Sequence, residues 1–156
     1  METRLAKEYL NIAKATETDA SALAALHAES FGAAKWSLAQ IAGSLALKTT
    51  LSPMVREGKK AKGFMLCQIA GDQAEILTFC VSPSARRNGL GTLLLNVAIN
   101  AALQRQVKRM FLEVGADNKG AIALYEKEGF RVTGKRPGYY KHDDKNIDAV
   151  MMSLDL

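Results

Sequence analysis

The chain has 156 residues, 48% of them hydrophobic and 24% charged, a composition that excludes a disordered or fibrous protein. We expect residues 1–156 to form one domain, since this length is enough to bury a core. Lysine and arginine outnumber aspartate and glutamate by 21 to 16, and the resulting charge of +5 favours anionic partners only weakly. The sequence shows neither a secretory signal pattern nor a run long enough to span a membrane. We therefore expect a cytoplasmic location without a membrane partner.

The cysteines and histidines do not form a recognisable metal or disulfide pattern. Cys67 and Cys80 both lie in apolar runs, which is typical of buried, reduced thiols. His27 lies in an alanine-rich segment and His142 in a charged one, without the spacing of metal ligands. We therefore expect no metal.

The first half of the chain alternates between strand-like and helix-like patterns. Residues 10–15 predict a strand, and residues 16–19 offer capping side chains for a helix that extends to residue 31. A second short helix is expected over residues 36–47. Three strands follow, joined by turns so short that neighbouring strands must be antiparallel: residues 51–56, 63–70 and 73–81.

The second half predicts two helices between further strands. The helices cover residues 90–106 and 118–128, with Asn118 as the cap of the second and Gly129 as its stop. The strands cover residues 108–115, 130–136 and 146–156. Antiparallel strands followed by a strand–helix–strand crossover predict a mixed α/β (α+β) fold.

The segment ARRNGLG, residues 85–91, places two arginines and two glycines where a strand gives way to a helix. The start of a helix exposes unpaired N–H groups and carries partial positive charge. Glycine lets a phosphate oxygen approach the backbone, and Arg86 and Arg87 add charge to the same loop. The segment therefore indicates a pyrophosphate site, although a basic surface loop with a tight turn is the alternative. The P-loop and dinucleotide-binding patterns are both absent.

Residues 86–91, RRNGLG, resemble the R/Q-x-x-G-x-G/A signature of the GNAT superfamily of acyl-CoA-dependent N-acetyltransferases. Residues 118–130, NKGAIALYEKEGF, resemble a second motif of that family. The resemblance implies a mixed, mostly antiparallel sheet of about six to seven strands flanked by about four helices, with acetyl-CoA as co-substrate. It implies the following cofactor-binding residues: Phe79, Cys80, Val81, Arg86, Arg87, Asn88, Gly89, Leu90, Gly91, Thr92, Asn118, Ala121 and Tyr125.

Four stretches resemble, more narrowly, the bacterial ribosomal-protein-alanine N-acetyltransferases of the RimI type: AEILTFCVSP, FLEVGADN, AIALYEKEGF and RPGYY. This resemblance implies Glu113 as general base and Tyr125 as general acid in direct attack by the N-terminal alanine of a small-subunit ribosomal protein. Tyr139 and Tyr140 are expected at the peptide-entry side, with packing at a strand end as the equal alternative. We expect no direct binding to DNA.

One segment departs from the narrower pattern. Residues 31–37, FGAAKWS, lack the proline found in that subfamily and are longer by one residue. Since the helices beside this segment shape the acceptor groove in the family that the chain resembles, other acceptors stay open: another peptide N-terminus, a lysine or a small amine. An N-terminal amine has a pKa of about 7.7–8.0, against about 10.4 for lysine. A weaker base is therefore enough to deprotonate an N-terminal amine than to deprotonate a lysine. A non-catalytic acyl-CoA-binding module is the alternative from another functional class.

Overall fold

The computed structural model describes residues 10–86, 89–142 and 144–156. Within these residues, the strands and helices follow in the order β1 (Leu10–Lys14), α2 (Ala20–Phe31), α3 (Leu38–Ala46), β2 (Thr50–Leu51), β3 (Pro53–Glu57), β4 (Lys60–Ala70), β5 (Gln73–Val81), α4 (Leu90–Gln104), β6 (Arg109–Gly115), α5 (Lys119–Lys127), β7 (Arg131–His142) and β8 (Lys145–Asp155). Apart from one predicted strand that is divided in two, the predicted order of elements is confirmed, as is the mixed sheet flanked by four helices in the described part of the chain.

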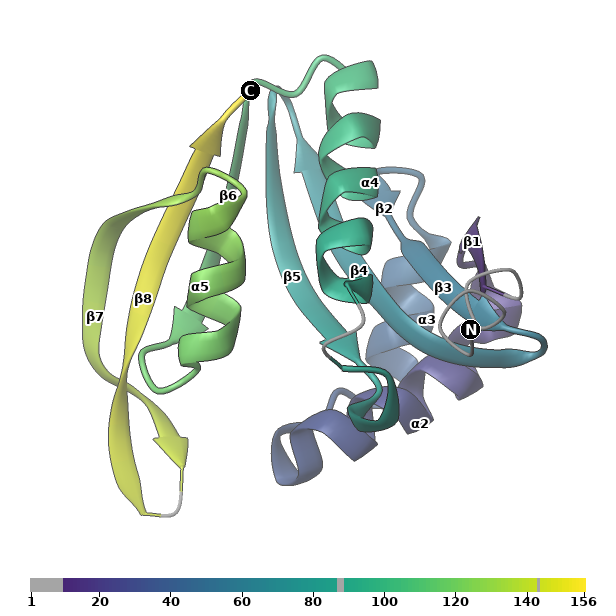
Figure 1. Cartoon of the computed structure of the whole chain (residues 1–156), viewed down its shortest axis with the longest axis horizontal. Helices are drawn as coiled ribbons and strands as arrows, with labels where there is room; N and C mark the ends of the chain where they lie inside the picture. Colours follow the sequence, from purple (N-terminus) through teal and green to yellow (C-terminus); the bar gives the residue numbers. More distant parts are fainter. Residues whose placement is uncertain (1–9, 87–88, 143) are drawn as a thin grey trace, which may run out of the picture.

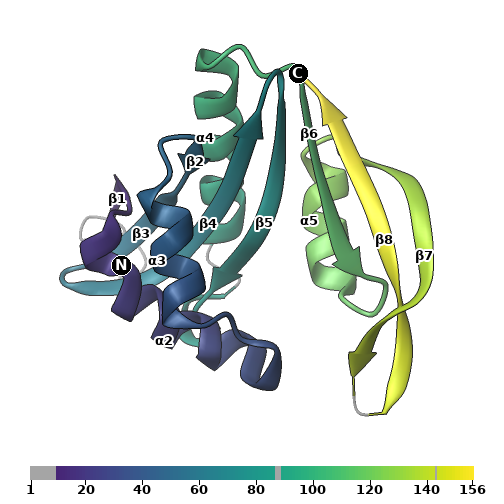
Figure 2. The ribbon, with the colours of Figure 1, turned by 180° about the vertical axis from the view of Figure 1, so that it is seen from behind.

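The strands form one sheet in the order β1-β3-β4-β5-β6-β8-β7, with β2 paired to β4 beside this path. All neighbours are antiparallel except β5 and β6, which pair in parallel only from Gln73–Arg109 to Ile76–Leu112. Beyond these residues the two strands diverge, and the sheet is split toward their C-terminal ends (Figures 1 and 2).

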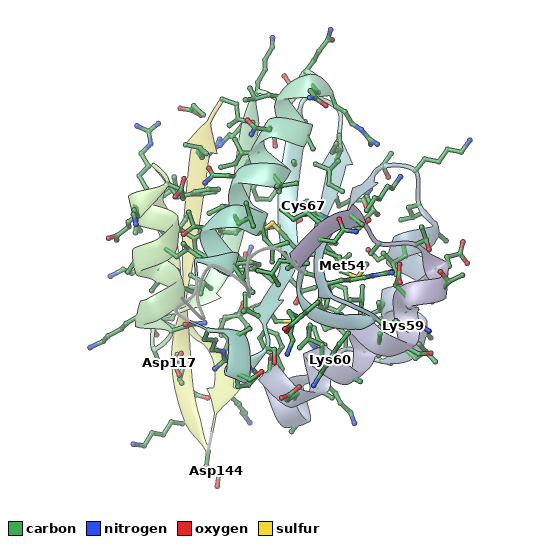
Figure 3. The ribbon with its side chains drawn as sticks, turned by 45° about the vertical axis from the view of Figure 1, so that its right-hand side comes forward. Met54, Lys59, Lys60, Cys67, Asp117 and Asp144 are labelled. Carbon is green, nitrogen blue, oxygen red and sulfur yellow. The ribbon has the colours of Figure 1, made fainter. Side chains whose placement is uncertain are left out.

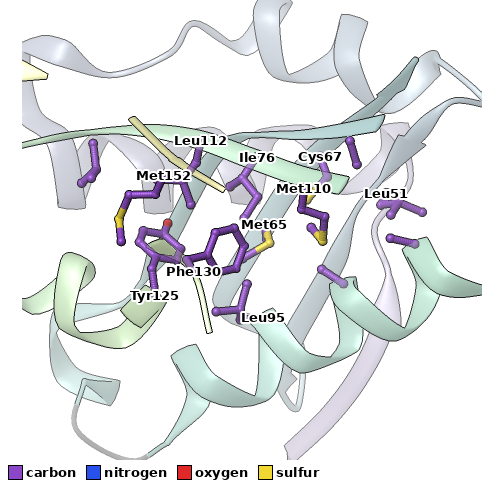
Figure 4. Close-up of a cluster of buried hydrophobic side chains, with 14 of the residues drawn as sticks. Leu51, Met65, Cys67, Ile76, Leu95, Met110, Leu112, Tyr125, Phe130 and Met152 are labelled. Carbon is purple, nitrogen blue, oxygen red and sulfur yellow. The ribbon is translucent and has the colours of Figure 1, made fainter. Parts of the chain in front are cut away.

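Helices cover both faces of the sheet. Helices α4 and α5 lie on one face, where they bury the larger apolar cluster, which includes Leu95, Met65 and Leu112 (Figures 1 and 4). Helices α2 and α3 lie on the other face over β3 and β4, where Leu23, Ile41 and Phe64 are fully buried (Figure 2). Both α4 and α5 begin at the end of the sheet where β5 and β6 separate, so their N-terminal N–H groups flank the split (Figure 1).

A β-bulge in β5 reverses the faces of the residues that follow it. Leu66 pairs with Thr78 and Cys67 with Ile76, so Leu77 has no partner in β4. Before the bulge, Ile76 points into the cluster under α4 and α5; after it, the even-numbered residue Thr78 points toward α2 instead. A bulge bends its strand, and this one lies directly beyond the last β5–β6 pair. The bend therefore accounts for the opening of the split.

Two predicted strands have different bounds in the structure. The strand predicted over residues 51–56 is divided at Ser52, whose backbone and hydroxyl both bond the backbone of Ala15. The strand predicted to end at residue 136 continues to His142, because a bulge absorbs Pro137 and Gly138 before Tyr140 pairs with β8. Gly138 takes a left-handed φ of 61°, which glycine adopts without steric cost.

Candidate active site

A cleft of about 630 Å³ occupies the split between β5 and β6. One wall is formed by the bulged part of β5 and the end of α2, and the other by the end of β6, the start of α5 and the β7–β8 hairpin. Of the site residues predicted from the sequence, six line it: Phe79, Glu113, Asn118, Ala121, Tyr125 and Tyr140. The structure therefore brings together residues from four separate elements.

Tyr125 extends from α5 into the base of the cleft. Its ring is 5% exposed and lies 5.5 Å from the ring of Phe130 and 6.3 Å from that of Phe79, centroid to centroid. Figure 4 shows its hydroxyl turned toward Leu112 and Met152 on the strands. Burial raises the pKa of the phenol well above its ordinary value, so the hydroxyl keeps its proton at neutral pH.

Glu113 lies on the opposite face of the sheet from Tyr125. Its neighbours along β6, Leu112 and Val114, point into the cluster that contains Tyr125, so alternation places Glu113 on the face of α2. The carboxylate is 3.1 Å from the guanidinium of Arg136 and is 22% exposed. The two predicted catalytic groups thus flank the split, one from each face.

The negative charge of Glu113 also affects the pKa of a second carboxylate, Glu75. Glu75 lies on β5 opposite Phe111, two residues before Glu113 on β6. Burial and the charge of Glu113 together raise the pKa of Glu75. Acidic groups therefore cluster on this side of the split, which favours a cationic group there.

The loop before α4 is the predicted pyrophosphate site. Gly89 caps the helix with a left-handed φ of 76°, and a Cβ built there meets no atom within 4 Å. Arg86 is exposed, and its Nε donates to the carbonyl of Val81 at 3.2 Å, which leaves its terminal N–H groups to face solvent. The first turn of α4 carries no acidic residue. An anion can therefore approach the N–H groups there, whereas the predicted Arg87 and Asn88 lie outside the described residues.

Gly91 has a packing role in addition to the one predicted. A Cβ at this position would lie 3.2 Å from Leu124 of α5 and 3.3 Å from the ring of Phe79. Contacts this close would require Leu124 or Phe79 to shift by a few tenths of an ångström. The absence of a side chain at Gly91 therefore lets α4 pack against β5 and α5 at the mouth of the cleft.

Several predicted cofactor residues can contribute only through their backbone or from the edge of the site. Cys80 packs in the cluster under α2, and burial raises the pKa of its thiol to about 12. Leu90, the first residue of α4, is buried in a separate small apolar cluster, and Val81 packs at the edge of this cluster. Thr92 is half-buried in the first turn of the helix.

The N-terminus of α5 places Asn118 and Ala121 at the cleft. The side-chain oxygen of Asn118 accepts the N–H of Ala121 at 3.2 Å, so the predicted cap is confirmed. This bond fixes the first turn of α5, which leads to Tyr125 one helical turn further along. Asp117, which also lines the cleft, lies in the loop that enters this helix (Figure 3).

Of the two predicted peptide-entry tyrosines, only Tyr140 lines the cleft. Tyr139 is 55% exposed, contacts Tyr140 edge to face at 5.1 Å and lies over Arg136 at 5.3 Å. Both belong to the β7–β8 hairpin, whose tip carries Asp144 (Figure 3). The pair thus forms an aromatic edge beside Glu113 and Arg136.

The cleft also contains residues that the sequence analysis did not place there, notably His27, Trp36 and Thr78. They come from α2, from the segment after it and from β5, and sequence spacing offers no signal for their meeting. Among the residues that the structure describes, no group of three or more histidine, cysteine or acidic side chains could hold a metal ion. None of the described helices is long and apolar enough to cross a membrane.

Comparison with known proteins agrees with this geometry. The model of the acetyltransferase (GNAT) family matches residues 20–130. The ribosomal protein bS18-alanine N-acetyltransferase of Escherichia coli strain K12 is 38% identical over 103 residues, 66% of this chain and 69% of the relative. The crystal structure of the ribosomal-protein-S18-alanine N-acetyltransferase from Escherichia coli aligns with a TM-score of 0.88 at 32% identity, over 94% of this chain and 93% of that one.

A more distant structure shares the fold alone. Arabidopsis thaliana NAA60 in complex with a bisubstrate analogue aligns with a TM-score of 0.84 at 17% identity, over 94% of this chain and 97% of that one. The resemblance stated from the two sequence motifs is therefore confirmed. With a family match over more than two thirds of its length, the chain belongs to the acetyltransferase (GNAT) family.

Proposed function

We propose that this protein transfers an acetyl group from acetyl-CoA to the N-terminal amine of a protein, and that its acceptor is the N-terminal alanine of a small-subunit ribosomal protein. The observation that carries the proposal is the position of Glu113 and Tyr125 on the two faces of the β5–β6 split. The similarity to the bS18-alanine N-acetyltransferases supports the choice of acceptor.

The residues around the split fit acetyl-CoA. The open backbone at Gly89, the first turn of α4 and the exposed Arg86 offer N–H donors for a pyrophosphate. Beyond Ile76 the edge of β5 is no longer paired with β6, so its backbone groups can bond the amides of an extended arm. When bound there, acetyl-CoA supplies an activated acyl thioester at the split.

The two catalytic groups then act from opposite sides. The carboxylate of Glu113, directly or through water, takes the proton of the acceptor ammonium and leaves a neutral amine for attack. The hydroxyl of Tyr125 donates its proton to the departing sulfur. Each positioned group is typically worth about 10²–10⁴-fold in rate. The cleft also raises the rate by holding the acceptor and the thioester in contact, because the attack becomes effectively intramolecular.

Direct transfer is favoured over an acyl-cysteine. The thiol of Cys80 is buried and points toward α2, away from Tyr125. Its pKa of about 12 leaves little thiolate at neutral pH. A stable acetyl-cysteine detected by mass spectrometry would overturn direct transfer.

The test is thiol release from acetyl-CoA with a short peptide that begins with alanine, copied from the ribosomal substrate. An N-terminally blocked twin and a lysine-containing peptide are the matched controls. We expect turnover only with the free alanine terminus. Turnover of the lysine peptide or of a small amine instead would contradict the proposed acceptor, and cofactor binding without turnover of any amine would indicate a binding module.

A further inference from the structure

His27 bonds two separate parts of the cleft wall at once. It lies in the last turns of α2, is 1% exposed and lines the cleft. Its Nδ1 accepts the backbone N–H of Trp36 at 3.0 Å, and its Nε2 lies 2.9 Å from the hydroxyl of Thr78. The N–H of Trp36 can only donate, so Nδ1 carries the lone pair and the proton is on Nε2, which donates to Thr78.

This bonding pattern leaves the imidazole without a free lone pair, so His27 cannot serve as a proton acceptor in this arrangement. Its ring stacks on Phe31 with centroids 4.3 Å apart, which fixes the ring plane as well. Burial lowers the pKa of His27, in agreement with a neutral ring.

His27 joins the segment after α2, which is expected to shape the acceptor groove, to the point where β5 leaves β6. Thr78 directly follows the bulge residue Leu77, where β5 begins to diverge from β6. The segment from Gly32 to Lys35 is a single 3-10 turn, closed by the N–H of Lys35 on the carbonyl of Gly32 at 3.1 Å. Trp36 at its end is tied to α2 by the bond to His27.

We propose that His27 is a positioning residue for the acceptor: by bonding Trp36 and Thr78 it sets the distance between the segment after α2 and the bulged strand. The inference rests on the proposed transfer to a peptide N-terminus. It places His27 on the side of α2, whereas the predicted cofactor residues on α4 and α5 lie across the sheet and β5 is expected to contact the cofactor through its backbone, not through the hydroxyl of Thr78. Loss of the bond to Trp36 therefore weakens peptide binding and leaves acetyl-CoA use unchanged.

Two substitutions separate the bonds. His27→Asn keeps an oxygen near the position of Nδ1 and so can still accept from Trp36. His27→Gln places its amide near the position of Nε2 and loses the bond to Trp36. We expect the peptide KM to rise roughly fivefold to tenfold in His27→Gln, the effect of one hydrogen bond, and clearly less in His27→Asn. In both variants, kcat and the KM for acetyl-CoA stay within about twofold of the unmodified values.

A second readout does not depend on turnover. Trp36 is the one tryptophan of the sequence, so its fluorescence reports directly on the position that the hydrogen bond to His27 gives it. We expect a shift of the emission maximum to longer wavelength in His27→Gln and not in His27→Asn. If the unmodified enzyme does not acetylate the peptide, the proposed function fails, while the emission of His27→Gln still decides whether the bond positions Trp36.

The matched control is Met54→Ala, a destabilising change in the same apolar cluster but away from the cleft. Equal increases of both KM values in His27→Gln and Met54→Ala would show a general loss of packing and overturn the proposal. An unchanged peptide KM or unchanged emission in His27→Gln would do the same. If His27→Gln does not fold, Thr78→Val removes the other bond, keeps the backbone of β5 and nearly keeps the shape of the side chain, and we expect the peptide KM to rise about twofold to threefold and more than the KM for acetyl-CoA.

Discussion

The carboxylate of Glu113 lies 3.1 Å from the guanidinium of Arg136, which reaches it from β7 across the intervening strand β8. Arg136 is half exposed and in turn lies under the ring of Tyr139. A pair this exposed contributes at most about 1 kcal/mol to stability. Its consequence is orientation: Arg136 holds the carboxylate at the split, and an acceptor ammonium can take over from Arg136 as its counter-charge.

Glu113→Gln removes the proposed base and keeps the shape of the side chain. We expect a fall in kcat/KM for the peptide of about 10²-fold or more. The fall is largest at low pH, where more of the acceptor amine is protonated and a base is needed most. Thiol-release rates across the pH range of the enzyme measure this, and a constant ratio of the two rates across pH would count against a base.

Tyr125→Phe removes the proposed proton donor from a ring that packing holds in place. Since the raised pKa keeps the hydroxyl protonated, we expect kcat to fall by about 10²-fold while the affinity for acetyl-CoA changes little. Calorimetry gives the affinity and thiol release gives kcat. Tyr140→Phe is the matched control at the outer edge of the cleft, and equal losses in both variants would dismiss a special role for Tyr125.

Arg86→Ala tests the pyrophosphate site. Removal of an exposed charge near the start of α4 should weaken acetyl-CoA binding by about tenfold, the value of one charge-assisted hydrogen bond. The loss shrinks as salt is added, because exposed charges are screened. Arg131→Ala, on the far strand β7, is the control in the same calorimetric titration. Equal affinities of the two variants would remove the assignment.

Much of this site could be predicted from the sequence because its signals are local. The RRNGLG loop and the Asn118 cap are short segments whose residue types determine their own conformation, and Tyr125 follows from the cap by helical spacing. The bulge at Leu77 is different, because it depends on how β5 aligns with β4. The bond between His27 and Thr78 joins residues 51 positions apart, so only the folded sheet brings them together. Likewise, the sequence predicts a strand that ends at residue 136, whereas pairing with β8 carries β7 past Pro137 to His142.

Gly91→Ala tests the packing role of that glycine. The added methyl group would press on Leu124 and Phe79 at 3.2–3.3 Å, and this strain opposes a gain of about 1 kcal/mol in helix propensity, so we expect a net loss of up to about 2 kcal/mol in the free energy of unfolding. Urea unfolding of the variant measures it. A double-mutant cycle with Leu124→Ala should show that the two changes cost less together than separately. Full additivity would place the strain elsewhere.

The buried His27 should make stability depend on pH. Its pKa is lowered in the folded state, so below the unfolded value of about 6.5 the unfolded chain binds more protons than the native one. The stabilising contribution of neutral His27 is therefore complete above that pH and is lost as the pH falls toward the lowered pKa. The loss is at most about 1.4 kcal/mol per pH unit for one proton.

The measurement for this last prediction is urea unfolding of the unmodified chain and of His27→Gln at several pH values between about 5 and 8, a range that brackets the ordinary pKa of histidine. Glutamine does not titrate, and every other group is common to both chains. The difference between their free energies of unfolding should thus be constant above about pH 6.5 and shift against the unmodified chain below it. A difference that stays constant over the whole range would mean that His27 titrates normally in the folded state and that its bonds to Trp36 and Thr78 do not hold it neutral.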